Sequence, residues 1–256
     1  MKQISFVFLL FLLCLPAQAA TDQVSFSSNT MQYDIGAGRF YAEGDVTIKG
    51  RGIVIIATQA NWQVNSKIFN LTGNITINGT WNGDNVKLSA TSATAEFSEN
   101  PVYILESGIS GSLGKIAIDC EYLQMIGENI VAKTVHKLQD QKAGITFSAT
   151  NINGKIDKGE LTQAEAEGNI VIRGTPSKSS GIIELKGKKA LYSTDRGTVV
   201  VSGGVSATQN KRNLKADTIV FFPATNRIEA LGNPRSQITL NIDDEKLQSP
   251  PPKNKK

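Results

Sequence analysis

Residues that carry catalysis and metal binding are scarce in this chain. It has one histidine, His136, and two cysteines, Cys14 and Cys120, among 256 residues. The sequence contains no P-loop, no G-x-S-x-G motif, no cysteine–histidine pair within a motif and no run of residues with metal-ligand spacing. We therefore expect no enzyme activity, no catalytic residues, no metal site and no cofactor, and we expect His136 to face solvent.

An excess of charge of one sign is missing from the body of the chain. The formal net charge is +4, but four of the basic residues, Lys2, Lys253, Lys255 and Lys256, lie at the two ends. Of the 27 Lys and Arg residues the remaining 23 equal the 23 Asp and Glu residues in number. A neutral body without a basic cluster excludes nucleic acid as a partner.

Long hydrophobic runs are limited to the first 20 residues. Met1-Lys2-Gln3 is a short positive segment, Ile4 to Leu15 is apolar except for Ser5, and Ala17-Gln18-Ala19 matches a cleavage signal. The apolar run is too short to cross a bilayer as a helix. We predict that residues 1–20 are a cleavable signal peptide of an exported protein, with an uncleaved anchor as the alternative.

Disulfide bonds are not expected in the exported chain. Once the signal peptide is removed, Cys120 is the only cysteine. The fold therefore has to be stabilised by its core alone. Since Cys120 lies between Asp119 and Glu121, whose charges would raise the pKa of the thiol, we expect a small buried side chain and not a nucleophile.

The dominant pattern is alternation with a period of two. Phe69, Leu71, Gly73, Ile75 and Ile77 alternate with asparagine and threonine, which predicts a strand with one apolar and one polar face. The sequons at Asn70, Asn74 and Asn78 fall on the polar face, where we expect a polar ladder and not glycans. No comparable stretch predicts a helix; the segment from Ile130 to Gly144 has helix-like spacing but fits an irregular strand pair equally well.

The alternating segment is repeated along the chain. An aromatic residue precedes a glycine by eleven positions in five units, with glycines at Gly44, Gly73, Gly108, Gly203 and Gly232. Turn residues separate the aromatic strand from the glycine strand, so each unit is a hairpin of antiparallel strands. A glycine inside a strand marks a bend or bulge. Glycines at one level would curl the whole sheet.

These features predict one all-β domain over residues 21–242, a sheet of about fourteen antiparallel strands stacked as hairpins. Strands near Val24–Ser28 and Ile238–Ile242 should form its two edges. Residues 243–256 have no apolar pattern and are rich in proline and lysine, which predicts a disordered polar tail. The apolar phase fits either a closed core or an apolar groove that holds acyl chains.

Two segments resemble a known family. The segments Tyr33–Gly50, YDIGAGRFYAEGDVTIKG, and Ala216–Gly232, ADTIVFFPATNRIEALG, are similar to repeats of the OstA-like (LptA) family of periplasmic lipopolysaccharide-transport proteins, to which LptC and the N-terminal domain of LptD are related. The resemblance implies a twisted antiparallel β-jellyroll built from repeated hairpins, with an elongated apolar groove for lipid A acyl chains. It also implies a periplasmic location in a Gram-negative bacterium and a role in outer membrane assembly.

The resemblance implies partners as well: lipopolysaccharide itself, and other OstA-like transport components joined by edge-strand pairing, including a head-to-tail homo-oligomer. Three alternatives stay open, namely an LptC-like protein, an OstA-like paralogue that binds another lipid, and a structural or polysaccharide-binding β protein with a closed core. On their shared strand phase, the residues expected to line a lipid path are Phe40, Val46, Ile48, Phe69, Leu71, Ile75, Ile77, Ile170, Ile172, Val199, Val201, Val205 and Ile228.

Overall fold

The computed structural model of the protein describes residues 24–63, 68–174, 181–209, 212–225, 227–232 and 237–240. The predicted signal peptide, residues 1–20, and the predicted tail, residues 243–256, lie outside these ranges. In the described ranges we find strands and turns, and no helix there is long and apolar enough to cross a membrane.

Sixteen strands make up the described part of the chain, and all of them belong to one antiparallel sheet. The strands are β1 (Ser25–Ser27), β2 (Thr30–Asp34), β3 (Arg39–Gly50), β4 (Ile53–Gln63), β5 (Ile68–Trp81), β6 (Asp84–Glu96), β7 (Val102–Leu113), β8 (Ile116–Ile126), β9 (Asn129–Asp140), β10 (Ile145–Asp157), β11 (Glu160–Gly174), β12 (Ile183–Ser193), β13 (Thr198–Gln209), β14 (Arg212–Phe222), β15 (Arg227–Leu231) and β16 (Gln237–Leu240).

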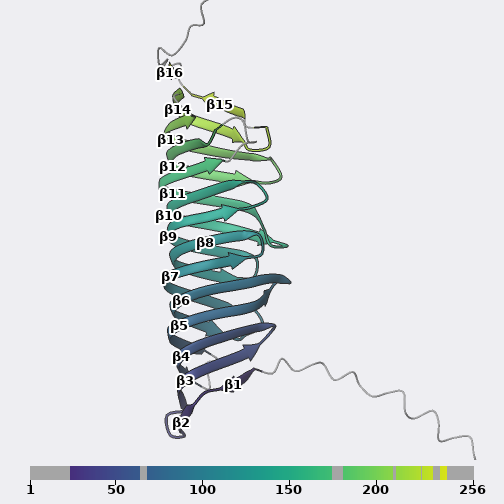
Figure 1. Ribbon diagram of the computed structural model, residues 1–256, viewed down its shortest axis with the longest axis vertical. Coiled ribbons are helices and arrows are strands. Elements are labelled where there is room, and N and C mark those ends of the chain that lie inside the picture. The colour runs from purple at the N-terminus through teal and green to yellow at the C-terminus, as the bar shows by residue number, and fades with distance from the viewer. Residues whose placement is uncertain are drawn as a thin grey trace, which may run out of the picture.

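The strands follow one another in the sheet in chain order from β3 to β14 (Figure 1). At one edge, β1 and β2 both pair with β3, and at the other edge β15 and β16 both pair with β14. Each edge pair therefore occupies one strand position, so the sheet has fourteen positions, as expected. The sheet is not closed, since its first and last strands do not pair with each other. The all-β antiparallel architecture of stacked hairpins is confirmed.

Each long strand is bent near its middle. Every pairing between β3 and β14 contains a shift of register, and in β5 the shift lies between Thr72 and Ile75. Gly73 and Asn74 occupy this position with φ of 75° and 46°, a left-handed backbone that glycine adopts freely and asparagine tolerates. The Thr58 hydroxyl donates to the carbonyl of Gly73 at 2.9 Å, so the bulge leaves that acceptor satisfied.

The five glycines predicted to bend the sheet all have a positive φ, and in Gly44, Gly73, Gly108 and Gly203 it lies between 62° and 90°. The bends fold the sheet over on itself, so that one half of every strand faces the other half. The two halves enclose one cluster of apolar side chains that runs from β3 to β14.

Folding at the bends brings two rows of connections together. The first row holds the strand ends at the β2–β3, β4–β5, β6–β7, β8–β9, β10–β11, β12–β13 and β14–β15 connections, and the second row holds the strand ends at the connections between them. Arg51 of the second row donates from Nη1 to the Glu99 carbonyl of the first row at 3.2 Å, and Asn82 donates likewise to Gly127. We call the line along which the rows meet the seam.

The seam is staggered. The β3–β4 connection meets the β6–β7 connection, and the β7–β8 connection meets the β10–β11 connection, where Lys115 N–H donates to the Gly159 carbonyl at 2.8 Å. Each connection therefore meets one three strands further along the chain. Four of the side-chain hydrogen bonds that cross the seam join residues 45 to 52 positions apart, and the bond from Lys142 to Glu160 joins residues 18 positions apart.

The stagger leaves the first row without an opposite wall at the N-terminal edge. Met31 and Tyr33 pair with Ala42 and Phe40, so they share the face that is buried elsewhere. Nevertheless Met31 is 45% and Tyr33 52% exposed, whereas Ala42 is 0% exposed. The apolar phase of the sheet thus reaches the surface at this edge.

The segment from Ile130 to Gly144 is the strand β9 followed by a turn, and not a helix. Its bend has no glycine: Thr134 has φ of 49°. Buried positions in β9 are 130, 132, 135, 138 and 140. Because of the irregular backbone in the middle of β9, the buried positions 132, 135 and 138 are three residues apart. This spacing resembles the period of a helix.

The close approach of two backbones at Gly79 gives a test of the sheet. A Cβ at Gly79, whose φ is 142°, would lie 2.1 Å from the Gly52 carbonyl oxygen. We expect Gly79→Ala to lower the free energy of unfolding by about 3 kcal/mol or more, because the backbone must shift as well as adopt a strained φ.

Gly83→Ala is the matched control, since Gly83 also has a positive φ, 85°, but has nothing within 4 Å of an added Cβ. Its expected cost is about 1–2 kcal/mol. Denaturant unfolding with an unchanged m-value measures both. Equal losses in the two variants would contradict the close packing of β4 against β5.

Candidate functional site

The apolar interior is the candidate site, because the residues predicted to line a lipid path lie there. Eleven of them are at most 3% exposed: Val46, Ile48, Phe69, Leu71, Ile75, Ile77, Ile170, Ile172, Val199, Val201 and Val205. Phe40 and Ile228 are partly buried and pack against the same cluster. The structure therefore brings all of these side chains into one interior; whether they contact lipid stays a prediction.

The interior is filled by the chain's own side chains. Residues from both halves of the sheet are buried against each other, among them Leu105, Ile116 and Phe147, each at most 1% exposed. The expected apolar groove is thus present as an elongated apolar interior whose space is occupied. Alanines such as Ala57, Ala90 and Ala149 lie at or next to the register shifts of their strands, where the two halves of the sheet approach one another and larger side chains would not fit.

Aromatic side chains gather at the N-terminal edge of the interior. The Trp62 ring stacks on Phe69 with 4.9 Å between centroids, and Phe69 meets Phe97 edge-on at 5.4 Å. Among the described residues, the buried Trp62 Nε1 and Tyr103 hydroxyl have no hydrogen-bond partner. Burial raises the pKa of Tyr103. This edge therefore combines ring surface with two polar groups that are free to bond a ligand.

One charged side chain is buried within the described ranges, and it lies at the seam. Asp140, at the end of β9, is 2% exposed. Its Oδ1 accepts the N–H groups of Lys142 and Ala143 at 2.9 and 3.0 Å, and its Oδ2 accepts the Tyr192 hydroxyl at 3.2 Å. Burial, followed by the charge of Asp140, raises the pKa of Tyr192. The hydrogen bonds compensate for the desolvation of the carboxylate.

Glu160, at the start of β11, is bonded to two lysines. Its Oε1 is 2.6 Å from Lys115 Nζ, and its Oε2 is 2.5 Å from Lys142 Nζ. The hydrogen bond from Lys115, followed by that from Lys142, lowers the pKa of Glu160. Because Glu160 belongs to the first row and both lysines to the second, these ion pairs cross the seam.

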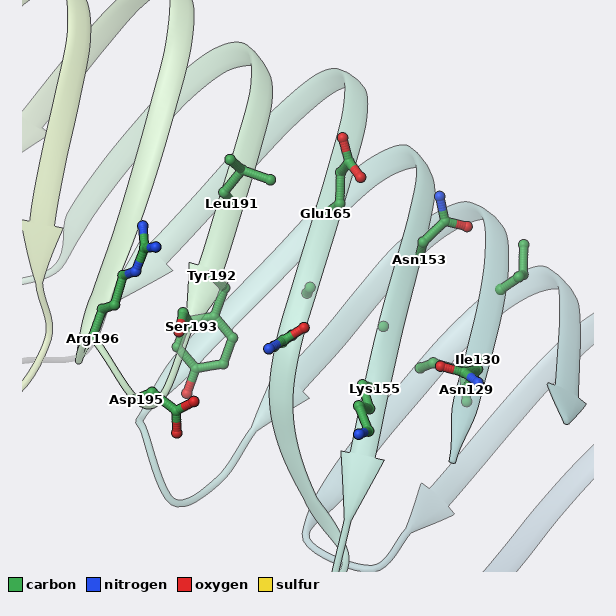
Figure 2. A pocket seen from close by; sticks show the side chains of 14 residues that line it. Asn129, Ile130, Asn153, Lys155, Glu165, Leu191, Tyr192, Ser193, Asp195 and Arg196 are labelled. Carbon is green, nitrogen blue, oxygen red and sulfur yellow. The ribbon is translucent and has the colours of Figure 1, made fainter. Parts of the chain in front are cut away.

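A hollow of about 580 Å³ lies on the outer surface of the sheet, next to the first row. Figure 2 shows side chains from four neighbouring strands around it, including Asn129 of β9, Asn153 of β10, Glu165 of β11 and Leu191 of β12. Amides, charges and the exposed Leu191 give it a mixed lining. Such a lining suits the polar part of a ligand better than an acyl chain.

The polar phase of the strands lies outside, as expected. Asn70, Asn74 and Asn78 are exposed, and Asn70 accepts a hydrogen bond from the Thr94 hydroxyl at 3.1 Å. His136 is also exposed, and the structure places its Nε2 3.4 Å from Glu121 Oε1 on the neighbouring strand. Within the described ranges, no three residues of the types His, Cys, Asp and Glu come close enough to hold a metal ion.

Sequence reasoning found the interior but missed the residues of the seam. Glu160 and Asp140 were not singled out, because their partners Lys115 and Tyr192 are 45 and 52 positions away. The sequence contains one signal. Asp140 follows Leu138 by two positions, so it lies on the face of the strand where an apolar residue is expected.

Comparisons with known proteins add little. No family model and no curated protein matches the chain. Among solved structures, it is similar to the crystal structure of LptH, the LptA-homologous periplasmic component of the lipopolysaccharide transport device from Pseudomonas aeruginosa. The identity is 10% over 86% of this chain and 95% of that chain, with a TM-score of 0.26. At these values the fold rests on the strands described above, and the family stays a prediction.

The position of Cys120 gives a test of how tightly the interior is closed. Cys120 is a free thiol, fully buried, and burial raises its pKa to about 12. Below this pH the thiolate is the minor form, and reagent must also reach it. We expect a thiol reagent such as dithionitrobenzoate to label native protein at pH 8 at least a hundredfold more slowly than protein in guanidinium. Rapid labelling of the native state would contradict a closed interior.

Proposed function

We propose that the protein is a periplasmic lipopolysaccharide-binding transport protein, which holds lipid A acyl chains in its interior. The observation that carries this proposal is the make-up of the interior. From β3 to β14 it is one continuous apolar cluster, in which Asp140 is the only charged side chain buried among the described residues. A path of this length with few buried polar groups suits acyl chains.

The way in which the two halves are joined supports the proposal. At the bends the chain is continuous, whereas at the seam the halves meet through individual hydrogen bonds, ion pairs and ring contacts. The halves can therefore part at the seam while the ladder of strand hydrogen bonds stays intact. Each methylene of an acyl chain that enters gains about 0.8 kcal/mol, which offsets the apolar contacts between the halves that are lost.

The charge of the protein agrees with recognition through the acyl chains. Lipopolysaccharide carries phosphates, yet the body of the chain has as many acidic as basic residues. Exposed cations such as Arg173, Lys186 and Lys189 are paired with glutamates. The apolar interior, and not a basic surface, then supplies most of the affinity.

The two edges of the sheet suggest how the protein joins the bridge between the membranes. Among the described strands, none pairs with the outer edges of β1–β2 and β15–β16. These edges can therefore pair with an edge strand of another OstA-like component or of a second copy. The two segments that resemble that family cover β2–β3 and β14–β15, at the two edges. Met31 and Tyr33 would be covered in such a stack.

The second candidate is a polysaccharide-binding β protein with a closed core. The outer hollow with its amide side chains favours it, because hydroxyl-rich ligands bond to such groups. In this case the interior contributes only stability. An LptC-like protein or a paralogue for another lipid shares the interior of the first proposal and differs from it in the lipid.

Photo-crosslinking separates the two functions. With benzoylphenylalanine at Phe40 or Phe69, aromatic sites of the inner face, we expect lipopolysaccharide to be captured in cells. At Asn70 or Thr72, exposed sites on β5, capture should fall at least tenfold. The readout is a lipopolysaccharide-positive band of shifted mobility. Equal capture on both faces, or none on the inner face, would count against the interior as the lipid site.

Assembly is tested by charge at the N-terminal edge. We expect Met31→Lys with Tyr33→Lys to weaken self-association or binding to a bridge partner more than tenfold, because the contact would bury two lysines. Leu191→Lys is the control, since Leu191 is 55% exposed but lies on the outer face. Sedimentation velocity over a concentration series measures both. A wild-type protein that is monomeric throughout and binds no partner would refute edge pairing.

A further inference from the structure

The closures of the seam differ in chemistry along its length. At two places the seam is closed by apolar packing: a Cβ at Gly50 would lie 3.3 Å from the Phe97 ring, and one at Gly174 would lie 2.7 Å from the Phe221 ring. Between them, where the β7–β8 and β9–β10 connections meet β11 and β12, the closure is ionic. We call Glu160, Lys115 and Lys142, with Asp140 and Tyr192, the clasp.

One carboxylate holds two connections in the clasp. Lys115 follows β7 and Lys142 follows β9, and both reach Glu160 at the start of β11. In the same clasp, the Tyr192 hydroxyl of β12 donates a hydrogen bond to the Asp140 carboxylate of β9. The clasp therefore joins the β7–β8 and β9–β10 connections of the second row to the ends of β11 and β12 that lie in the first row.

Ionic and apolar closures differ in what it costs to open them. Lys115 and Lys142 have side chains that are 58% and 64% exposed. They and Glu160 therefore regain water when they separate, and exposed ion pairs contribute little to stability. Separating Phe221 from Gly174 exposes apolar ring surface to water, and no hydration of a charged group compensates for it. The ion pairs of the clasp therefore hold the seam less strongly than the ring contacts do.

The two buried members of the clasp, Asp140 and Tyr192, are also consistent with opening at this place. Asp140 is buried, and its carboxylate is stabilised by water when the halves part. The Tyr192 ring lies 5.7 Å from Phe147 in the interior, so its movement uncovers the apolar cluster directly. Tyr192 also lines the outer hollow (Figure 2). The interior, the clasp and the hollow thus meet at one residue.

We infer that the clasp is the lateral access site of the interior, where acyl chains of an amphiphile pass between the two rows while its polar end occupies the outer hollow. This inference rests on the proposed function and names the position at which the ligand enters. The residues of the clasp control the rate of exchange and are not part of the path itself.

A disulfide across the seam tests the inference. Positions 115 and 160 are adjacent, since Lys115 N–H bonds to Gly159 and Lys115 Nζ to Glu160. With Cys14 and Cys120 replaced by alanine, Lys115→Cys with Glu160→Cys is oxidised, and bond formation is checked by mass. We expect uptake of cis-parinaric acid, which fluoresces in apolar surroundings, to slow at least tenfold and to recover on reduction.

The control disulfide joins two neighbouring strands without crossing the seam. Ser89 and Ser110 are register partners on β6 and β7, with 2.9 Å between their hydroxyl oxygens. Ser89→Cys with Ser110→Cys should take up the probe at the same rate oxidised and reduced. Equal rates for the oxidised and reduced clasp pair would overturn the inference.

A second variant removes only the charge. Glu160→Gln should speed uptake about threefold or more and should lower the hydrogen-exchange protection of the Lys115 amide. Glu184→Gln is its control, because Glu184 also bonds two cations, Arg173 and Lys186, at 2.9 and 2.8 Å, and has a similar side-chain exposure of 27%, but bridges neighbouring strands only. If both variants leave uptake and the Lys115 amide unchanged, the clasp does not control opening.

The outcomes separate the inference from the proposed function. If the unmodified protein takes up neither cis-parinaric acid nor lipopolysaccharide, the proposed function fails and the inference fails with it. If it takes up both, while the locked clasp and Glu160→Gln behave as their controls do, the proposed function stands and only the position of access is wrong.

Discussion

The bend in the middle of each strand is the constraint on which the rest of the structure depends. Every pairing from β3 to β14 shifts register there, as between Thr72 and Ile75, and a residue with left-handed backbone accompanies each bend that was predicted from a glycine. A straight sheet of this length would have one apolar face and nothing to cover it. Because all strands bend at one level, the sheet covers itself, and an interior, a seam and two rows of connections follow.

The interior serves stability and, in the proposed function, ligand binding with the same side chains. A residue such as Ile75, 1% exposed, packs against the opposite half when the protein is empty and would pack against an acyl chain when it is loaded. The exchange of one apolar partner for another keeps both states close in free energy. Additional polar groups in the interior would destabilise the loaded state, because an acyl chain cannot form hydrogen bonds with them. The charged groups Asp140 and Glu160 lie at the seam.

Much of the fold follows from local sequence, and the seam does not. Alternation around Gly73 predicted both the strand and its bend, because each depends on residues next to one another. β9 was harder to predict, since Thr134 takes the place of the glycine and its buried positions lose the period of two. The pairing of Lys115 with Glu160 depends on the three-strand stagger, which no local pattern encodes. Likewise, alternation showed which face is inside but not that side chains from the opposite half fill it, nor that Met31 and Tyr33 emerge at the edge.

The stagger has a consequence for how such a chain comes to be folded. From β3 to β14 each strand pairs with its neighbours in the sequence, and β1 and β16 pair with the next strand but one. The side-chain hydrogen bonds across the seam span no more than 52 residues. No strand of the described sheet needs a strand from a distant part of the sequence as its pairing partner. Topologies with such short separations order quickly, and repeat architectures extend from a formed end. A chain delivered N-terminus first can close its own wall a few hairpins behind the point of delivery, so that little apolar surface is uncovered at any moment.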